Sequence, residues 1–321
     1  MDDTEWLAGH FERHRPHLRA VAYRMLGSLT EADDAVQDTW LRLSRSGTEG
    51  VENLGAWLTT IVARVSLNML RSRNHRREEP LAVHIPDPVV SPDGETQPEE
   101  AAVLADSVGL ALLVVLDTLT PDERLAFVLH DMFDLPFSEI GPAVGRTPAA
   151  AKQLASRARR RVREAGVPAA DPDPARQREV VDAFFAAARR GDFGALVALL
   201  HPGVVARGDF GARRPMVLIR GAEAVARQSL LGAALPGARL YPALVNGARG
   251  AVSTVHGQPF AVMSFAVADG KITEIDTIAD SGRVAKIAAA VLTPEIVPTA
   301  TCPRHDHSDP AVPGFDAKPE T

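Results

Sequence analysis

The amino-acid sequence predicts a multidomain protein: two all-α units, the second with a helix-turn-helix, followed by an α+β unit. Apolar residues recur at helical spacing through the first half of the chain, whereas alternating, β-rich runs are expected from residue 251 onward. Proline-rich stretches separate these segments. A chain of 321 residues is also long enough for two or three compact domains.

The proline-rich stretches set the expected domain boundaries. Five prolines mark residues 78–100 as a linker between helical units at 1–77 and 101–164. A second linker at 165–174 precedes the α+β unit at 175–292, and the rest, 293–321, is expected to be a disordered tail. That tail holds the only cysteine, Cys302, near His305 and His307, a set too sparse to predict a metal site.

The composition favours a cytoplasmic protein without a membrane partner or a cofactor. Hydrophobic residues make up 45% of the chain, yet no apolar run approaches the roughly 20 residues that span a membrane. The first residues are acidic, unlike a signal peptide, and a single cysteine allows no internal disulfide. The net charge of −6 argues against indiscriminate coating of nucleic acid, so local basic clusters matter more than the sum.

The first unit carries one such cluster on a predicted helix. A helix from about Leu54 has an apolar side, which leaves Arg64, Asn68 and Arg71 at i, i+4 and i+7 on another face. A polar stripe of this kind can lie along a DNA strand, and Arg73 extends its positive charge. The alternative is an ordinary solvated helix face.

The second unit has the layout of a helix-turn-helix. Phe137 to Ile140 begin a short helix, Gly145 supplies the positive φ of a tight turn, and Thr147-Pro148 caps a longer helix. The second helix of this motif enters the major groove with its N-terminal end first. The residues expected near DNA are therefore Arg146, Thr147, Ala149, Lys152, Gln153, Ser156 and Arg157, with Arg160 on a phosphate. A plain helical hairpin is the alternative.

The third unit changes from helices to strands. A helix rich in Phe and Ala is followed by β-rich runs at 251–256, 260–267 and 271–278, and Asp269-Gly270 is a strong hairpin signal. Helices before an antiparallel sheet indicate an α+β domain.

Several motifs of the chain resemble those of one family. The segments 34–41 (DAVQDTWL), 56–58 (AWL) and 68–71 (NMLR) are similar to the first domain of extracytoplasmic-function sigma factors of the sigma-70 family. The segments 116–124 (LDTLTPDER), 137–140 (FSEI) and 152–159 (KQLASRAR) are similar to the second domain. The third unit resembles the SnoaL-like cone that is fused to one subgroup. The ordered combination is more specific than any single motif.

The resemblance implies partners and residue roles. It implies that Asp34, Asp38, Trp40 and Leu41 dock on the β′ clamp helices of core RNA polymerase, with the β flap as a further contact. The stripe at Arg64 would recognise and open the −10 element, and the helix-turn-helix would read the −35 element. The protein would then be a transcription initiation factor and not an enzyme.

Three points stay open on the sequence alone. Gly141-Pro142 falls inside the first helix of the motif, where the family usually has ordinary helix formers. The third unit is expected to regulate the others, by clasping them or by sensing a small ligand, with Asp209 and Asp276 as possible pocket residues. The rival functions are a ligand-responsive repressor and an isomerase or cyclase with helical fusions.

Overall fold

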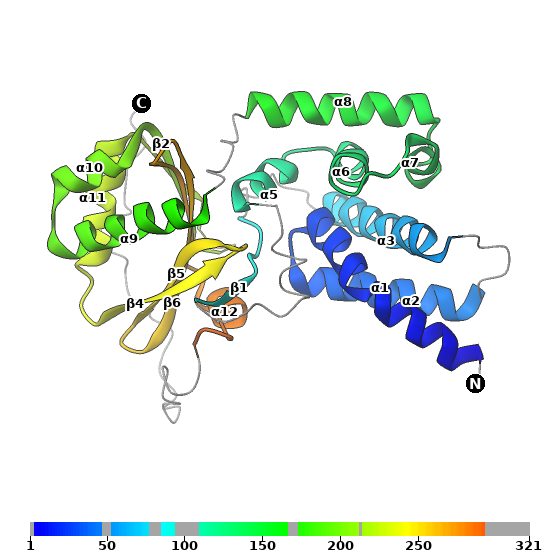
Figure 1. The fold of residues 1–321 in the computed structure, drawn as a ribbon, viewed down its shortest axis with the longest axis horizontal. Helices are drawn as coiled ribbons and strands as arrows, with labels where there is room; N and C mark the ends of the chain where they lie inside the picture. The colour runs from blue at the N-terminus through cyan, green and yellow to red at the C-terminus, as the bar shows by residue number, and fades with distance from the viewer. Residues whose placement is uncertain are drawn as a thin grey trace. The chain divides into compact units, whose positions relative to one another are not determined.

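The computed structural model describes residues 3–46, 53–76, 85–93, 109–165, 173–211 and 214–292. These residues fall into two compact units, divided at residues 89/90, 95/96 and 167/168. The first is entirely helical, and the second combines helices with one sheet (Figure 1). The expected fold class is therefore confirmed. Cys302, His305 and His307 lie outside the described residues.

The helical unit begins with three long helices that pack on one another: α1 (Asp3–Leu26), α2 (Leu29–Ser46) and α3 (Leu54–Arg76). Their apolar stripes close over a shared core, as their helical spacing predicts. Its fully buried side chains include Leu18, Val21, Met25, Val36, Leu43, Leu58 and Val62.

The described part of the helical unit holds four further helices and a π-helical turn. They are α5 (Leu110–Asp117), α6 (Pro121–Phe127), η1 (Val128–Met132), α7 (Phe137–Val144) and α8 (Pro148–Glu164). The start of α6 is fixed by a capping box, in which Thr120 accepts a hydrogen bond from the Glu123 backbone and Glu123 accepts one from the Thr120 backbone. The π-helical turn is a local irregularity that helical periodicity does not predict.

The α+β unit holds a seven-stranded sheet with strand order β1-β4-β5-β6-β7-β2-β3 among the described residues. Neighbouring strands are antiparallel except β2 and β7. Asp269 and Gly270 both have positive φ and join β6 to β7, as the hairpin signal predicts. The strands are β1 (Val90–Pro92), β2 (Leu200–Asp209), β3 (Val217–Arg220), β4 (Ala238–Val245), β5 (Ala248–Val255), β6 (Gln258–Ala268) and β7 (Lys271–Ile278).

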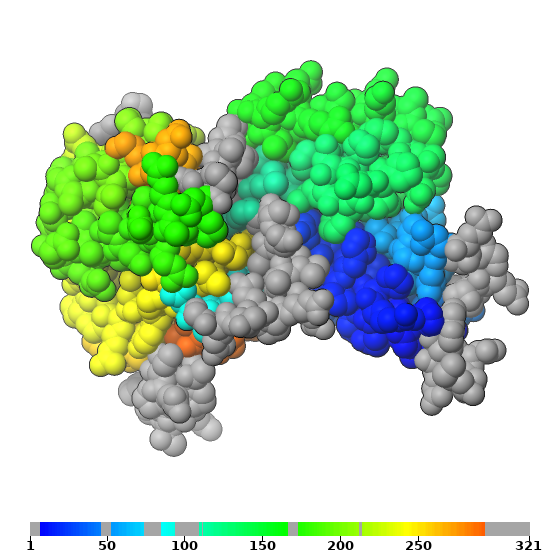
Figure 2. All heavy atoms as spheres, in the orientation of Figure 1, coloured from blue at the N-terminus to red at the C-terminus, as the bar shows by residue number. Residues whose placement is uncertain are grey.

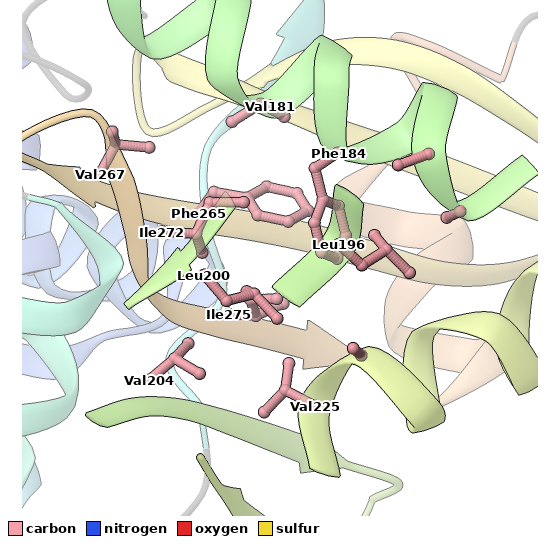
Figure 3. Packing of buried hydrophobic residues seen from close by; sticks show 13 residues of the cluster. Val181, Phe184, Leu196, Leu200, Val204, Val225, Phe265, Val267, Ile272 and Ile275 are labelled. Carbon is pink, nitrogen blue, oxygen red and sulfur yellow. The ribbon is translucent and has the colours of Figure 1, made fainter. Parts of the chain in front are cut away.

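Helices cover one face of this sheet and enclose its core. They are α9 (Pro174–Arg190), α10 (Phe193–Leu199) and α11 (Ala222–Ala233), while the short α12 (Ser281–Ile287) follows the last strand. Phe184 of α9 packs on Phe265 of β6 with ring centroids 5.6 Å apart, and Leu196, Val225 and Ile275 surround them (Figure 3). Burial of these aromatic and aliphatic side chains holds the helices against the sheet.

One strand comes from a segment that the sequence marks only as linker. Val90, Ser91 and Pro92 pair with β4, so residues 90–93 belong to the α+β unit even though α9 begins more than eighty residues later. Proline is tolerated here because β1 lies at the edge of the sheet, where one row of backbone groups needs no strand partner. Residues 85–89 thus belong to the helical unit and residues 90–93 to the α+β unit.

Candidate nucleic-acid interface

The helix-turn-helix of the helical unit has the turn chemistry that its sequence predicts. Gly145 adopts a φ of 69°, and the Thr147 hydroxyl accepts a hydrogen bond from the Ala150 amide at 3.3 Å. Gly141 is needed for close approach, because a Cβ there would lie 2.9 Å from the Pro148 nitrogen. The Gly141-Pro142 departure therefore fits a turn that folds back tightly on α7, and α7 continues through Pro142.

One face of α8 is buried and the opposite face is exposed. Ala151, Leu154, Ala155 and Ala158 are buried against the rest of the unit. The turn before α8 and the exposed face of α8 present all the residues of the second unit that the sequence predicts for DNA contact: Arg146, Thr147, Ala149, Lys152, Gln153, Ser156, Arg157 and Arg160. The stripe begins at the N-terminal end of α8, which is the end that a recognition helix directs into the groove.

Acidic residues hold several arginines of α8 in place. The Glu123 carboxylate, almost fully buried, accepts from Arg161 at 2.7 Å and lies 3.3 Å from Arg157. Arg159 pairs with Asp131 at 2.6 Å. These ion pairs fix α8 on α6 and η1, so part of the positive charge of the helix has a structural task.

The polar stripe of α3 lies where α6 and α7 pack against it. Arg64 donates a hydrogen bond to the Pro142 carbonyl at 2.8 Å, and Arg71 pairs with Asp122 at 2.7 Å. Asn68, between them on the stripe, is exposed. The structure thus brings the three residues together on one face, as their spacing predicts, and two of them bind the second helical domain.

A buried arginine joins the two helical domains near the same stripe. Arg124 is 1% exposed, pairs with Asp117 at 2.8 Å and donates to the Arg24 carbonyl at 3.1 Å. Burial lowers the pKa of the Arg124 guanidinium, and Asp117 opposes that effect. Arg73 approaches this cluster and pairs with Glu31 at 3.3 Å. In Figure 2 the blue atoms of the first helical domain lie directly against the green atoms of the second.

The acidic helix α2 presents a separate exposed face. Asp34, Asp38 and Leu41 stand at i, i+4 and i+7, all three exposed, and 42% of Leu41 is accessible to solvent. Trp40 lies off this face, half-buried, with its ring 5.1 Å from that of Phe11. An exposed leucine beside two carboxylates is suited to a protein partner, whereas Trp40 contributes to the packing of α1 on α2.

Known proteins share these features along most of the chain. The family profile of Sigma-70 region 2 matches residues 10–76, and that of Sigma-70, region 4 matches residues 109–162. The ECF RNA polymerase sigma factor SigJ of Mycobacterium tuberculosis is 41% identical over 288 residues, which cover 85% of this chain and 91% of SigJ. The chain belongs to the ECF sigma factors. As a member of this family it binds core RNA polymerase and promoter DNA and directs transcription initiation.

One further relative and a solved structure support this assignment. The probable ECF sigma factor SigI of the same species is 34% identical over 281 residues, covering 87% of this chain and 94% of SigI. The crystal structure of the Mycobacterium tuberculosis SigJ protein superimposes with a TM-score of 0.70 at 37% identity, covering 86% of this chain and 97% of that one. The likeness therefore includes the C-terminal α+β unit of this sigma factor, its SnoaL-like domain.

The SnoaL-like domain encloses a cavity of about 300 Å³ between α9, α11 and the helix-covered face of the sheet. Its wall is largely aromatic and aliphatic and includes Phe185, Phe260, Met263 and Phe265. A cavity of this volume, with apolar walls, is in the range of small-molecule sites in proteins.

Neither carboxylate that the sequence suggests for this pocket belongs to its lining. Asp209 pairs with Arg283 of α12 at 2.7 Å, and Asp276 pairs with Arg207 at 2.8 Å. Side chains alternate between the two faces of a strand, so Ile275 and Thr277 line the cavity while Asp276 between them points away. The prediction of an acidic pocket is therefore wrong.

Burial perturbs the carboxyl group of Asp276. Asp276 is 3% exposed, and burial raises its pKa to about 6, although its ion pair with Arg207 lowers that pKa. Arg207 also pairs with Glu274 at 3.1 Å, so one guanidinium is shared by two carboxylates. The arrangement is a buried ion network within the sheet.

A second ion cluster fastens the β1 segment to the SnoaL-like domain. Asp93 pairs with Arg178 of α9 at 2.8 Å and also binds Arg249 of β5. Arg249 in turn pairs with Asp182 at 2.6 Å. The hydrogen bond from Arg178 lowers the pKa of the Asp93 carboxyl. Sequence reasoning missed this cluster, because its members are far apart along the chain and no motif connects them.

Two kinds of feature are absent from the described part of the chain. No group of His, Cys, Asp and Glu there is arranged to hold a metal ion. Among the same residues, no helix combines the length and apolarity that a membrane span needs.

Proposed function

We propose specific residue roles for this sigma factor in promoter recognition. The exposed N-terminal part of α8, with Lys152, Gln153 and Ser156, contacts bases of the −35 element. The α3 stripe of Arg64, Asn68 and Arg71 contacts the opened −10 element, and Arg73 and Arg160 contact phosphates. The acidic face of α2 docks on the β′ clamp helices, and the β flap binds near the second helical domain.

The proposed mechanism rests on the contacts that the second helical domain makes with α3. Arg64 and Arg71 cannot hold Pro142 and Asp122 and at the same time bind DNA through the same guanidinium atoms. The described arrangement is therefore a closed state. Binding of core polymerase, which holds both helical domains, would separate them and release the stripe.

The SnoaL-like domain acts as the regulator of this opening. Strand β1 binds the segment that follows α3 to the sheet of the SnoaL-like domain, and Asp93 secures it. Residues 85–89 belong to the helical unit and lead directly into β1, so the stability of β1 in the sheet is proposed to bias the closed state. A small molecule in the cavity can change that stability.

We favour a regulatory role over catalysis for the same domain. Both buried carboxylates are paired with arginines, and neither reaches the cavity, so no general base faces a bound molecule. A repressor that works without polymerase is disfavoured because the relatives are sigma factors along most of their length. The protein would act in the cytoplasm, where core polymerase and promoter DNA are found.

Run-off transcription tests the proposal. Core polymerase is combined with a library of promoter fragments and either no added protein, the full chain, or a chain truncated near residue 175. Discrete starts that need the added protein are expected, and the truncated chain should give a different yield because its regulator is missing. Equal yields from both chains would contradict regulation by the SnoaL-like domain. Silence from both would contradict promoter recognition by these residues.

A further inference from the structure

The cavity of the SnoaL-like domain has an apolar interior and a basic entrance. Phe184 and Phe185 of α9 stack edge-on against Phe265, with ring centroids 5.6 Å and 5.2 Å away, and Phe265 lines the cavity from the sheet. Figure 3 shows Phe184 beside Phe265. A molecule inside would exchange water for aromatic and aliphatic contacts on several sides. Each Å² of apolar surface so buried contributes about 25 cal/mol to binding.

Among the described residues, the charged residues that line the cavity are three arginines. Arg189 lies in the last turn of helix α9 and Arg239 lies on β4, and both are exposed, which places them where the cavity meets solvent. Neither forms an ion pair with any residue in the described ranges. The third, Arg207, is already committed to Glu274 and Asp276.

Ion pairing varies among the other surface arginines: Arg190 and Arg220 form no ion pair within the described residues, whereas others do. Arg159 and Arg227, for example, are paired with Asp131 and Glu223. An unpaired cation beside an apolar cavity gains most from an anionic group, since hydrogen bonds between guanidinium and carboxylate are charge-assisted. No acidic residue belongs to the lining, so a cationic ligand would find only like charge there.

We propose that the cavity binds an amphiphilic monoanion: an apolar body inside, with one carboxylate at the entrance held by Arg189 and Arg239. The inference rests on the proposed small-molecule role of the cavity and adds the chemical class of the ligand. The partially exposed head group explains why a carboxylate is tolerated without full desolvation. The apolar body supplies affinity, and the arginine pair supplies selectivity for charge.

Calorimetric titration of the full chain with three matched probes tests the class. The probes are decanoate, decanol and decylamine, which share one apolar chain and differ in head group, each used below its aggregation concentration. Decanoate should bind about tenfold tighter than decanol, which corresponds to about 1.4 kcal/mol, and decylamine should bind more weakly than either. The preference for decanoate should shrink at high salt because its head group is exposed.

Three variants locate the site. Arg189→Gln combined with Arg239→Gln should reduce decanoate binding to the level of decanol and leave decanol unchanged. Arg227→Gln, a paired arginine on α11 outside the lining, serves as the matched control and should change neither. Ala206→Phe, which fills part of the cavity from β2, should weaken both probes; thermal unfolding identifies loss of fold.

The outcomes of these titrations test the chemical class of the ligand and the ligand-binding role of the cavity separately. Equal binding of decanoate and decanol, both sensitive to Ala206→Phe, would leave the cavity as a ligand site but overturn the anionic class. Absence of binding by all three probes to a folded chain would overturn both. Decanoate binding that survives the double arginine variant would place its head group elsewhere and overturn the assignment to Arg189 and Arg239.

Discussion

The guanidinium Nη2 of Arg71 lies 2.7 Å from the Oδ1 of Asp122, and this contact joins the first helical domain of the sigma factor to the second. Arg71 stands on the stripe of α3 proposed for the −10 element, and Asp122 stands in the first turn of α6. A single carboxylate thus occupies a guanidinium that we propose binds DNA in the open state. Any change that weakens the pair should favour the open state.

Replacement of Asp122 should increase DNA binding by the free protein. Asp122→Asn removes the charge partner of Arg71 at nearly constant volume. Because an exposed ion pair contributes about 0.2–1 kcal/mol, affinity for a single-stranded −10 fragment should rise about 1.4- to fivefold. Fluorescence anisotropy of a labelled fragment measures this. Asp131→Asn, which removes the partner of Arg159 within the second domain, is the control, and an equal gain there would count against a closed stripe.

Charge reversal on α2 should separate polymerase binding from DNA binding. Asp34→Lys with Asp38→Lys changes two exposed carboxylates beside Leu41, and should weaken core polymerase binding by at least about tenfold. DNA fragment binding by the free protein should persist. Glu12→Lys, an exposed substitution on α1, is the control. The assignment fails if polymerase binds the double variant and the parent protein equally well in a pull-down titration.

Loss of the Asp93 carboxylate should loosen β1. Asp93→Asn weakens the ion pairs with Arg178 and Arg249, and should lower the free energy of unfolding by about 1 kcal/mol at neutral pH. The pKa of Asp93 is lowered in the folded state, so its contribution is present above the unfolded pKa near 3.8 and is lost as pH falls further. As the pH is lowered, the free energy of unfolding of the variant should therefore fall less than that of the parent chain.

Chemical denaturation from pH 2.5 to 7 tests this prediction for Asp93. Glu223→Gln, which breaks an exposed pair with Arg227 on α11, should leave the profile close to that of the parent. Parallel pH profiles for Asp93→Asn and the parent chain would rule out a stabilising role for the Asp93 carboxylate.

The pH dependence at Asp276 should have the opposite sign. Its folded pKa is raised to about 6 from an ordinary value of 3.8, so the folded state binds the proton more tightly than the unfolded chain. The stabilisation is complete below about pH 3.8 and is lost as pH rises through about 6. Asp276→Asn should remove the fall in unfolding free energy that this group causes between pH 4 and 6. If the trend in unfolding free energy persists in the variant, another group is responsible.

Close packing at Gly141 should make the helix-turn-helix intolerant of a methyl group. Gly141→Ala places a Cβ 2.9 Å from the Pro148 nitrogen and 3.0 Å from the Arg146 carbonyl oxygen, and overpacking of this kind costs about 1–3 kcal/mol. Gly9→Ala on α1 meets no atom within 4 Å and should be neutral or stabilising. Urea unfolding followed by circular dichroism compares the two. A neutral Gly141→Ala would mean that the turn has room that the structure does not show.

Local features of the site were predictable because they depend on neighbours in sequence. The φ of Gly145, the Thr147 cap and the exposed stripe on α8 follow from turn chemistry and helical period. The hairpin at Asp269-Gly270 follows in the same way. Trp40 was expected at the polymerase face, but its position one residue from Leu41 turns it toward Phe11. A short stretch of helix does not reveal which neighbour covers such a side chain.

Contacts between residues far apart in the sequence decided the remaining features of the fold and the site. The sequence alone determined the order of the units, the helix-turn-helix and the family, since periodicity, caps and motifs are written in adjacent residues. Only the tertiary structure decided that Arg71 meets Asp122, that Asp276 turns away from the cavity and that residues 90–92 add a strand to a distant sheet. Many segments of the chain could pair with each of these residues locally. Packing and charge over the whole fold select one partner, because the other pairings would not close the core.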